Sequence, residues 1–333
     1  MKTAFLMRSD IYFRYVYPDE VIAYLVGNAG CDGLCHTKEE VLAEPEKFAD
    51  TEYIFTTWFM PSFSADEIRQ YLPSLKCVFN GAGTVQYFAR PFLECGVKVF
   101  SAWAANAIPV AEYTAAQIVL ANKGFFKASR IKSREGYGEA DRLFRKYTGN
   151  YRAKVGVIGA GMIGKLVIRK LHEYDVEVVT FDPFLPDSMQ DELGVRKVSL
   201  EELFSTCNVV SNHLADNPQT VGMLNGALFE RMLPYATFLN TGRGAQVVES
   251  ELCSVLSARP DLTAILDVTS PEPPQDGSPL YSLDNCILTS HIAGSMGNEV
   301  HRLAEYMLRE YMKYSSGEAT SYEVTEKMLE TMA

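Results

Sequence analysis

The stretch VGVIGAGMIG, residues 155–164, decides the fold of this 333-residue chain. An apolar run leads into three glycines, Gly159, Gly161 and Gly164, and a helix-like stretch follows to Tyr174. A second apolar run then ends at Asp182. The order strand, glycine turn, helix, strand, carboxylate is what a dinucleotide pyrophosphate requires. The first glycine makes the tight turn, the second lets the backbone approach phosphate, and the third lets the helix pack on the strand.

Asp182 indicates which dinucleotide would bind. It lies 18 residues after Gly164, close to the spacing of roughly 20 expected for a ribose-binding acid. A carboxylate there accepts hydrogen bonds from the adenosine ribose and repels a 2′-phosphate, and no arginine directly follows it. We therefore predict NAD rather than NADP. The alternative is a strand-end aspartate that only caps a turn.

Composition limits the class of protein. The length suggests two domains, and 47% hydrophobic with 22% charged residues is an ordinary globular balance. The net charge of −11 argues against nucleic acid or an anionic membrane as a partner. The basic segment 123–154 is an exception. We interpret it as a solvated or subunit-contacting arm, with nucleic-acid binding as the alternative.

Cysteine usage and hydropathy predict a cytoplasmic protein. The seven cysteines are scattered and odd in number, which is typical of reduced thiols. Cys31, Cys35 and His36 are too few for a convincing zinc site, so we expect no metal. The chain start resembles no signal peptide, and no stretch reaches 18 consecutive apolar residues.

Short apolar runs alternate with helix-like pieces on both sides of the glycine turn. This alternation predicts parallel strands with crossover helices. The expected strands are 3–7, 53–58, 76–80, 97–101, 155–158, 176–181, 208–214, 236–240, 263–268 and 286–290. The expected helices are 19–26, 64–71, 87–95, 110–123, 162–174, 199–205, 227–232, 250–258 and 297–314.

Several helix starts carry their own signals. Ser64 with Glu67, and Ser199 with Glu202, have capping-box spacing. Asn225 is placed to cap a helix, and Pro109 is placed at the first position of one.

The fold class that follows is α/β with two domains, a central Rossmann domain inserted in a flavodoxin-like α/β substrate domain. The predicted boundaries are 1–104 for the first part of the substrate domain, 105–296 for the dinucleotide-binding domain, and 297–333 for the returning helix and tail. A cleft between the two domains is where we expect substrate and nicotinamide to meet.

Three ionisable residues follow predicted strands of the central domain: Arg243, Glu272 and His291. Ligands of an open parallel sheet bind outside the carboxyl ends of its strands. Arginine suits bidentate capture of a carboxylate, and histidine suits proton exchange near neutrality. Singly, these residues could be a surface arginine, a loop carboxylate and a core histidine. As a set behind the glycine turn they indicate catalysis.

These motifs together resemble the D-isomer-specific 2-hydroxyacid dehydrogenases, a family that also includes formate and phosphite dehydrogenases. The resemblance extends over roughly residues 75–315. The matching segments, in chain order, are FNGAGT (79–84), NAIPVAEY (106–113), VGVIGAGMIGK (155–165), FDP (181–183), NTGRGAQVVE (240–249), LDVTSPEP (266–273) and ILTSHIAG (287–294).

The resemblance implies a role for each residue. Arg243 would hold the substrate carboxylate and polarise the 2-oxo group, His291 would be the general acid–base, and Glu272 its partner. Formate-type members carry glutamine in place of Glu272, so the match favours a hydroxyacid enzyme. The residues expected to bind cofactor are Gly159, Gly161, Met162, Ile163, Gly164, Asp182, His213, Thr241, Gly242, Asp267 and Gly294.

The expected substrate contacts come mainly from the N-terminal part. The resemblance implies that Gly81, Ala82, Gly83 and Thr84 offer backbone N–H groups to the substrate carboxylate, beside Arg243. Trp58 and Trp103 follow strands or precede the domain crossing, and we hypothesise that they shape the pocket. The segment 214–218 reads LADNP where relatives usually have LPLTP, so its contacts with cofactor are open.

The function that we predict is NAD-dependent interconversion of a 2-oxo acid and its D-2-hydroxy acid. The alternatives are a dinucleotide-sensing scaffold of the corepressor type and a dehydrogenase of another small oxyanion such as phosphite. The expected partner is a small-molecule acid, with neither nucleic acid nor membrane. The helix at 109–123 and the arm after it resemble the family's dimer contact, which implies a homodimer.

Overall fold

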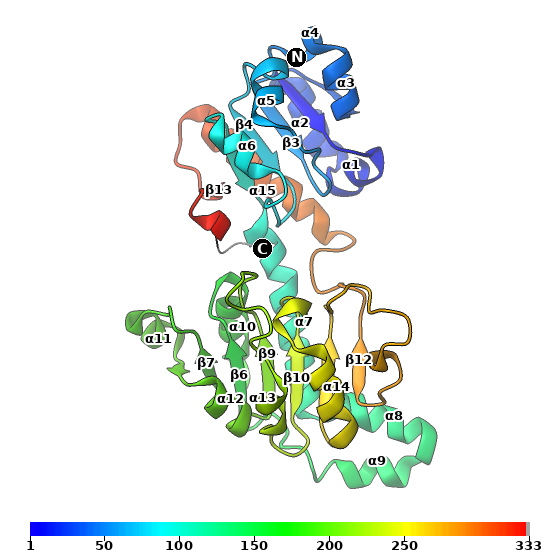
Figure 1. Ribbon diagram of the computed structural model, residues 1–333. Coiled ribbons are helices and arrows are strands. Elements are labelled where there is room, and N and C mark those ends of the chain that lie inside the picture. Colours follow the sequence, from blue (N-terminus) through cyan, green and yellow to red (C-terminus); the bar gives the residue numbers. More distant parts are fainter. Residues whose placement is uncertain (331–333) are drawn as a thin grey trace. The chain divides into compact units, whose positions relative to one another are not determined.

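A computed structural model describes residues 1–330, without the side chains of 131–135 and 139–140, and it falls into two compact units (Figure 1). Unit 1 comprises Met1–Asn106 and Ser295–Ala333, and unit 2 comprises Ala107–Gly294. The first division falls inside helix α7 (Trp103–Asn122). Unit 2 is therefore inserted in unit 1 along the chain, as the fold-class prediction stated.

The described part of unit 1 contains one six-stranded sheet. Its strands, in spatial order, are β13 (Glu323–Val324), β5 (Lys98–Ser101), β4 (Cys77–Asn80), β3 (Tyr53–Thr56), β1 (Thr3–Leu6) and β2 (Cys31–His36). All neighbours pair in parallel except β13, which runs antiparallel along β5. The parallel part has the flavodoxin-like order, with the direction of winding reversing at β1 and β3.

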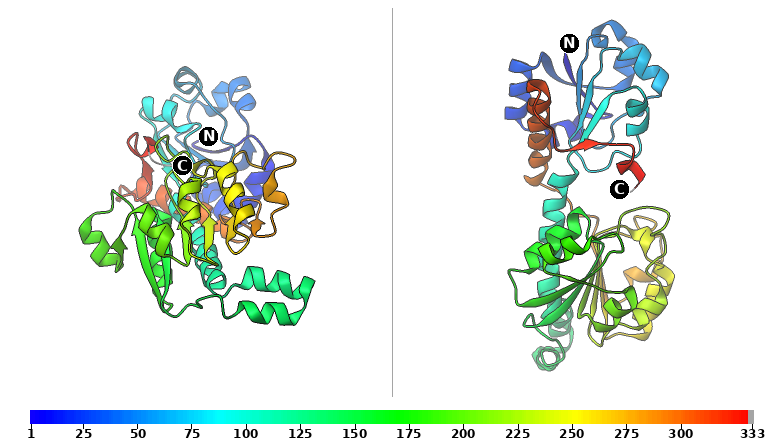
Figure 2. Two further views of the ribbon diagram at one scale, coloured as in Figure 1. Left: turned by 60° about the horizontal axis from the view of Figure 1, so that its bottom comes forward. Right: turned by 90° about the vertical axis from the view of Figure 1, so that its left-hand side faces the viewer.

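Helices cover both faces of the unit 1 sheet, because residues of alternating parity are apolar on each strand. Phe5, Phe55, Phe79 and Phe100 lie on one face, against α1 (Asp10–Val16), α2 (Asp19–Asn28) and α15 (Glu299–Ser316). Ile54, Val78 and Val99 lie on the other. That face is covered by α3 (Lys38–Ala43), α4 (Pro45–Phe48), α5 (Ala65–Tyr71) and α6 (Ala89–Glu94) (Figure 2).

Within the described residues, unit 2 is a doubly wound parallel sheet of seven strands. In spatial order they are β12 (Cys286–Leu288), β11 (Thr263–Leu266), β10 (Thr237–Asn240), β9 (Val209–Asn212), β6 (Ala153–Ile158), β7 (Val176–Phe181) and β8 (Arg196–Lys197). The order reverses at β6 and β9. The glycine turn follows β6, so it lies where a doubly wound sheet binds its ligand.

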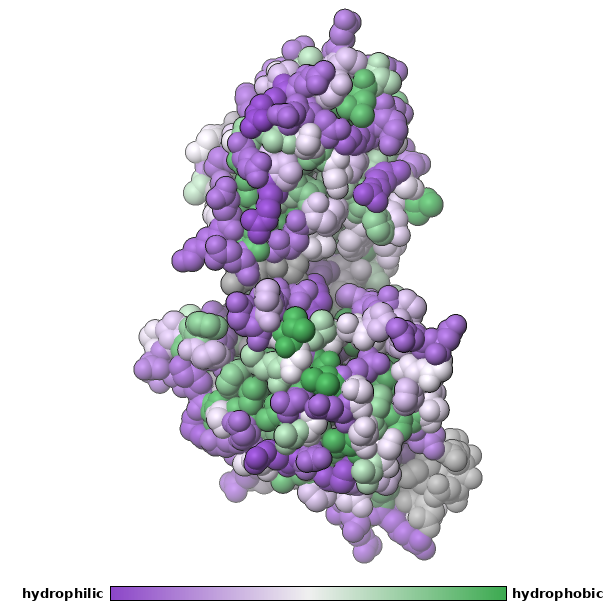
Figure 3. Space-filling view, viewed as in Figure 1, coloured by the Kyte–Doolittle hydropathy of each residue, from purple (hydrophilic) through white to green (hydrophobic). Residues whose placement is uncertain are grey.

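Two clusters of buried side chains sandwich the unit 2 sheet. One joins the sheet to α12 (Leu200–Thr206), α13 (Gly226–Glu230) and α14 (Glu249–Ala258). The other joins it to α7, α10 (Met162–Leu171) and α11 (Asp187–Leu193). The apolar side chains therefore lie inside, and the face in Figure 3 intersperses hydrophilic with apolar residues, as is usual for a folded surface.

Several predicted boundaries were wrong. Helix α7 begins at Trp103 and contains Pro109, instead of starting at Pro109. The preceding residues Ala104, Ala105 and Ala107 favour helix, and a proline there removes one backbone donor without ending it. Strand β2 was missed because Cys31–His36 contains a glycine and lacks clear alternation of apolar and polar residues. Helix α1 was also missed.

The capping predictions differ in outcome. Ser64 and Glu67 form the reciprocal capping box, and Asn225 accepts from Leu228 N. Ser199 accepts from Glu202 N at 3.1 Å. The Glu202 carboxylate instead bonds Arg196 at 2.7 Å. An available guanidinium thus outcompetes a backbone N–H for that carboxylate.

The arm after α7 forms two helices, α8 (Phe125–Glu135) and α9 (Tyr137–Leu143).

All seven cysteines are free, and five of them are buried. In residues 1–330, no helix is both long and apolar enough to cross a membrane. The same described residues hold no cluster of three or more His, Cys, Asp or Glu side chains suited to a metal ion.

Candidate active site

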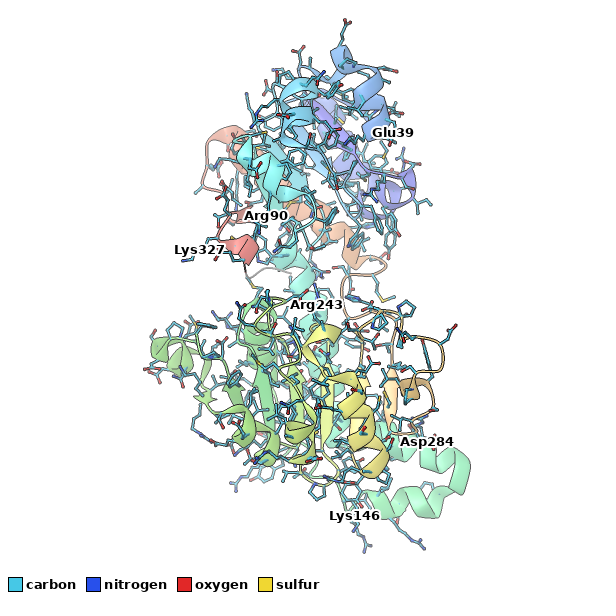
Figure 4. The ribbon with its side chains drawn as sticks, in the orientation of Figure 1. Glu39, Arg90, Lys146, Arg243, Asp284 and Lys327 are labelled. Atoms are coloured by element: carbon cyan, nitrogen blue, oxygen red, sulfur yellow. The ribbon has the colours of Figure 1, made fainter. Side chains whose placement is uncertain are left out.

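The predicted site residues of unit 2 follow the carboxyl ends of neighbouring parallel strands. Along the sheet these are His291 after β12, Asp267 and Glu272 after β11, Arg243 after β10, His213 after β9, Gly159 after β6 and Asp182 after β7. Within unit 2, Figure 4 places Arg243 at the end opposite to Asp284 and Lys146. The topology therefore gathers all seven residues at one edge of the sheet.

The glycine turn has the geometry for binding a pyrophosphate. Gly159 has φ of +85°. A Cβ at Gly164 would lie 2.0 Å from the Gly159 carbonyl oxygen, so that contact between turn and helix requires glycine. A Cβ at Gly161 would meet no atom within 4 Å, which leaves open space before α10. The helix N-terminus and this space fit the anionic part of a dinucleotide.

Asp182 shapes the turn with both of its carboxylate oxygens. Its Oδ2 accepts from Ala160 N at 2.8 Å, and its Oδ1 accepts from Phe184 N at 2.9 Å. The capping role that we weighed as an alternative is therefore present. Each carboxylate oxygen has a second lone pair, so these bonds are compatible with accepting from ribose hydroxyls.

His213 is a neutral, buried group behind the glycine turn. His213 Nε2 lies 2.8 Å from Ser211 Oγ. Nδ1 has no hydrogen-bond partner among the described residues. Burial lowers the pKa of His213 to about 3. A Cβ at Gly159 would lie 2.7 Å from the His213 carbonyl oxygen. The backbone of His213 therefore lies directly against the glycine turn.

Asp267 organises the loop that carries the catalytic candidate. It is 1% exposed, and its Oδ1 accepts from Thr289 Oγ1 at 2.6 Å and from Ile292 N at 2.9 Å. Its Oδ2 accepts from Ala293 N at 2.9 Å, and its backbone oxygen accepts from His291 N at 3.0 Å. Asp267 therefore fixes the position of the His291 loop.

His291 and Glu272 form a direct pair. His291 Nδ1 lies 2.7 Å from Glu272 Oε1, and the two side chains are 48% and 43% exposed. Nδ1–H donates a hydrogen bond to the carboxylate, which favours the tautomer with the proton on Nδ1 and leaves Nε2 for proton exchange. His291 also has φ of +58°, a conformation that non-glycine residues adopt rarely and that recurs at functional sites.

Arg243 lies on the neighbouring strand end. Its Nη1 donates to Gly242 O at 2.9 Å, and its Nε lies 3.8 Å from Asp216 Oδ2. The next residue, Gly244, packs directly on the loop that leads to Glu272, because a Cβ there would lie 2.0 Å from the Thr269 carbonyl. The loops that carry the guanidinium and the carboxylate are therefore in contact.

Gln246 was missed by the sequence analysis. It is fully buried, and its Oε1 accepts from Asn212 Nδ2 at 2.6 Å and Arg243 N at 3.3 Å. Its Nε2 donates to Leu214 O at 3.0 Å and Ala215 O at 2.9 Å. The signal in the sequence was an asparagine ending each of two apolar strands, Asn212 and Asn240, which are themselves bonded at 3.0 Å.

The remaining predicted cofactor residues differ in their surroundings. Thr241 is buried, with its hydroxyl 3.1 Å from Thr114 Oγ1. The Gly242 N–H donates to Asn240 Oδ1 at 3.0 Å. Met162 is exposed, Ile163 packs on the core, and Gly294 is the last residue of unit 2.

The predicted substrate loop of unit 1 directs its carbonyl groups inward. Asn80 Nδ2 donates to Ala82 O and Thr84 O, and Ser101 Oγ lies 2.9 Å from Ala82 O and 2.7 Å from Gly83 O. The N–H groups of Ala82, Gly83 and Thr84 donate to no residue in the described chain. The loop is thus able to present backbone donors to an anion.

One substrate residue needs correction. The Gly81 N–H donates to Thr56 O at 2.7 Å, because Gly81 continues the parallel ladder that pairs Asn80 with Thr56. It is therefore not available to a substrate carboxylate, and the expectation narrows to the next three residues. Trp58 and Trp103 are partly buried against the two cores of unit 1, with ring contacts to Tyr12 and Tyr322.

Comparison with known proteins identifies relatives. Residues 116–293 match the family model for the NAD-binding domain of D-isomer specific 2-hydroxyacid dehydrogenases. The D-3-phosphoglycerate dehydrogenase of Archaeoglobus fulgidus is 30% identical over 232 residues, which are 69% of this chain and 43% of the relative. That of Methanocaldococcus jannaschii is 28% identical over 279 residues, 83% and 51% of the two chains. This chain thus spans about half the length of these curated relatives.

Solved structures share the fold. The D-mandelate dehydrogenase of Rhodotorula graminis aligns with a TM-score of 0.79 at 20% identity, covering 98% of each chain. A phosphoglycerate oxidoreductase from Rhizobium etli aligns with a TM-score of 0.80 at 20% identity, covering 98% of this chain and 99% of the other. The matched family domain contains the glycine turn, Asp182, Arg243, Glu272 and His291. The chain belongs to the D-isomer-specific 2-hydroxyacid dehydrogenases and carries their NAD-binding domain.

Proposed function

We propose that this protein is an NAD-dependent oxidoreductase that interconverts a 2-oxo acid and its D-2-hydroxy acid. The observation that carries the proposal is the 2.7 Å pair of His291 and Glu272, on the strand ends next to Arg243 and at the same sheet edge as the glycine turn. This reaction requires an acid–base group, an anion-binding group and a dinucleotide-binding site close together.

The chemistry divides between cofactor and protein. Bound NADH supplies the hydride. His291, holding a proton on Nε2, delivers it to the oxygen that was the 2-oxo group, and Glu272 stabilises the charged imidazole. Arg243 binds the substrate carboxylate and stabilises negative charge that develops on the oxo oxygen. In the oxidative direction His291 takes the proton from the hydroxyl.

The roles of the two units follow from this proposal. Residues 105–296 hold the cofactor, and residues 1–104 with 297–333 form the substrate domain. The loop Ala82–Thr84 supports this role because its N–H groups face no protein acceptor among the described residues. Trp58 and Trp103 are the proposed pocket-shaping aromatics.

We also infer a homodimer through the helix at 109–123 and the arm. The support is that these segments carry five large apolar side chains that are exposed, because association covers exposed apolar surface. These are Leu120 (37% exposed), Phe125 (49%), Tyr137 (70%), Phe144 (64%) and Tyr151 (67%).

Turnover tests the proposed function. Purified protein is incubated with NADH or NADPH and a panel of 2-oxo acids, and cofactor oxidation is followed at 340 nm. We expect activity with NADH on at least one acid. Arg243→Ala should lower kcat by about 10²–10³-fold, the scale for one preorganised donor. A wild-type protein that binds NADH but reduces no 2-oxo acid would favour a dinucleotide-sensing scaffold instead.

A further inference from the structure

The loop after β9 is held in a defined position against the Arg243 loop. Gln246 Nε2 donates to Leu214 O and Ala215 O, and Thr220 Oγ1 donates to the same Ala215 O at 2.7 Å. Leu214 N donates in turn to Asn212 Oδ1 at 3.2 Å. Asp216 is the next residue along, so this partly buried hydrogen-bond network restrains its backbone.

The backbone of Arg243 is fixed by the same amide, because its N–H donates to Gln246 Oε1. Gln246 thereby sets the separation between Arg243 and the loop of Asp216. The side chains meet with 3.8 Å between Arg243 Nε and Asp216 Oδ2. They are 36% and 43% exposed, so the pair is partly shielded from solvent.

The contacts of Arg243 leave one side of its guanidinium for a ligand. Nε faces the Asp216 carboxylate, and Nη1 donates to Gly242 O at 2.9 Å. Two protein oxygens thus restrain the group. Nη2 has no hydrogen-bond partner among the described residues, and it suits a substrate carboxylate. The negative charge of Asp216 also offsets part of the positive charge that an incoming anion would meet.

We propose that Asp216 is a positioning residue for Arg243, and this rests on the proposed function of Arg243 in holding the substrate carboxylate. Asp216 restrains the guanidinium in the orientation that serves turnover and weakens ground-state binding of anions. It therefore raises kcat at the expense of affinity. A residue that only maintained the loop would have a different signature, since its loss would weaken binding and lower stability.

Asp216→Asn, Asp216→Glu and the matched control Asp191→Asn, an exposed acid on α11, test the proposal. With NADH-saturated enzyme and the best 2-oxo acid, Asp216→Asn should lower KM and kcat each by about 2- to 5-fold, the scale of a partly exposed ion pair. The inhibition constant of oxalate should fall with KM. Asp216→Glu should restore kcat partly, and 0.5 M NaCl should shrink the differences. Asp191→Asn should leave KM, kcat and the inhibition constant of oxalate at their wild-type values. None of the three variants should change the melting temperature.

The outcomes separate the two ideas. A rise, or no change, in KM and in the inhibition constant of oxalate in Asp216→Asn would overturn the positioning role. The role would also be overturned if Asp216→Asn changed KM and kcat equally in the wild type and in an Arg243→Lys background. Oxalate binding to the NADH complex, followed by calorimetry, is a readout that needs no turnover. If wild type reduces no 2-oxo acid but Asp216→Asn still tightens oxalate binding, the proposed function fails and the pairing stands.

Discussion

His291 Nδ1 lies 2.7 Å from Glu272 Oε1, although the two residues follow different strands of the unit 2 sheet. Asp267, which is buried, holds the His291 loop by three hydrogen bonds from side-chain and backbone donors. The imidazole is therefore supported from two carboxylates, one at the ring and one at the loop. In the proposed function, this arrangement leaves Nε2 for proton exchange.

Replacing His291 tests that assignment. His291→Gln should lower kcat for reduction by about 10²–10⁴-fold, the contribution of a positioned acid–base. Glu272→Gln should cause a smaller loss, because the histidine remains. Steady-state kinetics with NADH and the best 2-oxo acid measure both losses. A His291→Gln variant that keeps the wild-type kcat would contradict the assignment.

Two glycines of the turn should respond differently to alanine. Gly161→Ala meets open space, so the free energy of unfolding should change by less than about 1 kcal/mol, while NADH affinity should fall at least about 10-fold because the Cβ occupies the phosphate's approach. Gly164→Ala would force its Cβ against the Gly159 carbonyl and should lower both. Fluorescence titration with NADH and thermal unfolding distinguish the two variants. Equal loss of stability in both would show that the space at Gly161 is not open.

His213 predicts a dependence of stability on pH. Burial lowers its pKa to about 3, whereas the unfolded value is about 6.5. Between these values the unfolded chain binds a proton that the folded chain does not, so the free energy of unfolding falls as pH falls, by up to about 1.4 kcal/mol per pH unit from this group. Denaturant unfolding at pH 7 and pH 5 should show a smaller loss for His213→Gln than for wild type.

His301→Gln, a change in α15 of unit 1, is the control for that series. It should lose stability on acidification as wild type does. An acid dependence that is the same in wild type and His213→Gln would mean that the imidazole is protonated, or reaches solvent, in the folded protein.

The proposed dimer contact is open to a charge substitution. Phe144→Glu places a carboxylate in the exposed apolar run of the arm and should shift the protein from dimer to monomer in light scattering after gel filtration. Ile11→Glu changes a side chain of unit 1 that is 76% exposed and should leave the mass unchanged. A wild-type monomer, or a dimer that persists in Phe144→Glu, would argue against the arm as the contact.

The fold could be predicted largely from local patterns. Apolar runs that end in glycine or aspartate marked the strands around Gly159 and Asp182, because strand, turn and helix lie within one short segment. Prediction from local patterns failed for Cys31–His36. This segment is a strand because it pairs with β1, and its own composition does not indicate one. Such prediction failed again at α7, where a proline at an allowed position was interpreted as a start.

The site could be predicted as residue types at strand ends, but its contacts could not. Gln246 bonds residues 31 to 34 positions earlier in the chain, and only the folded sheet brings those loops together. The Gly81 N–H was assigned to substrate because the sequence does not show that Thr56 O receives it. Asp216 stood out only as a departure from the usual family pattern, and its partner Arg243 appeared with the structure.

The discontinuous course of unit 1 has a consequence for biogenesis. Its phenylalanine-rich sheet face is completed by Val300, Leu303 and Met307 of α15, which leave the ribosome only after the whole of unit 2. During translation, α1 and α2 are made early, but the part of that face that α15 covers stays exposed until all of unit 2 has been added. Exposed apolar surface of this kind makes a nascent chain prone to aggregate.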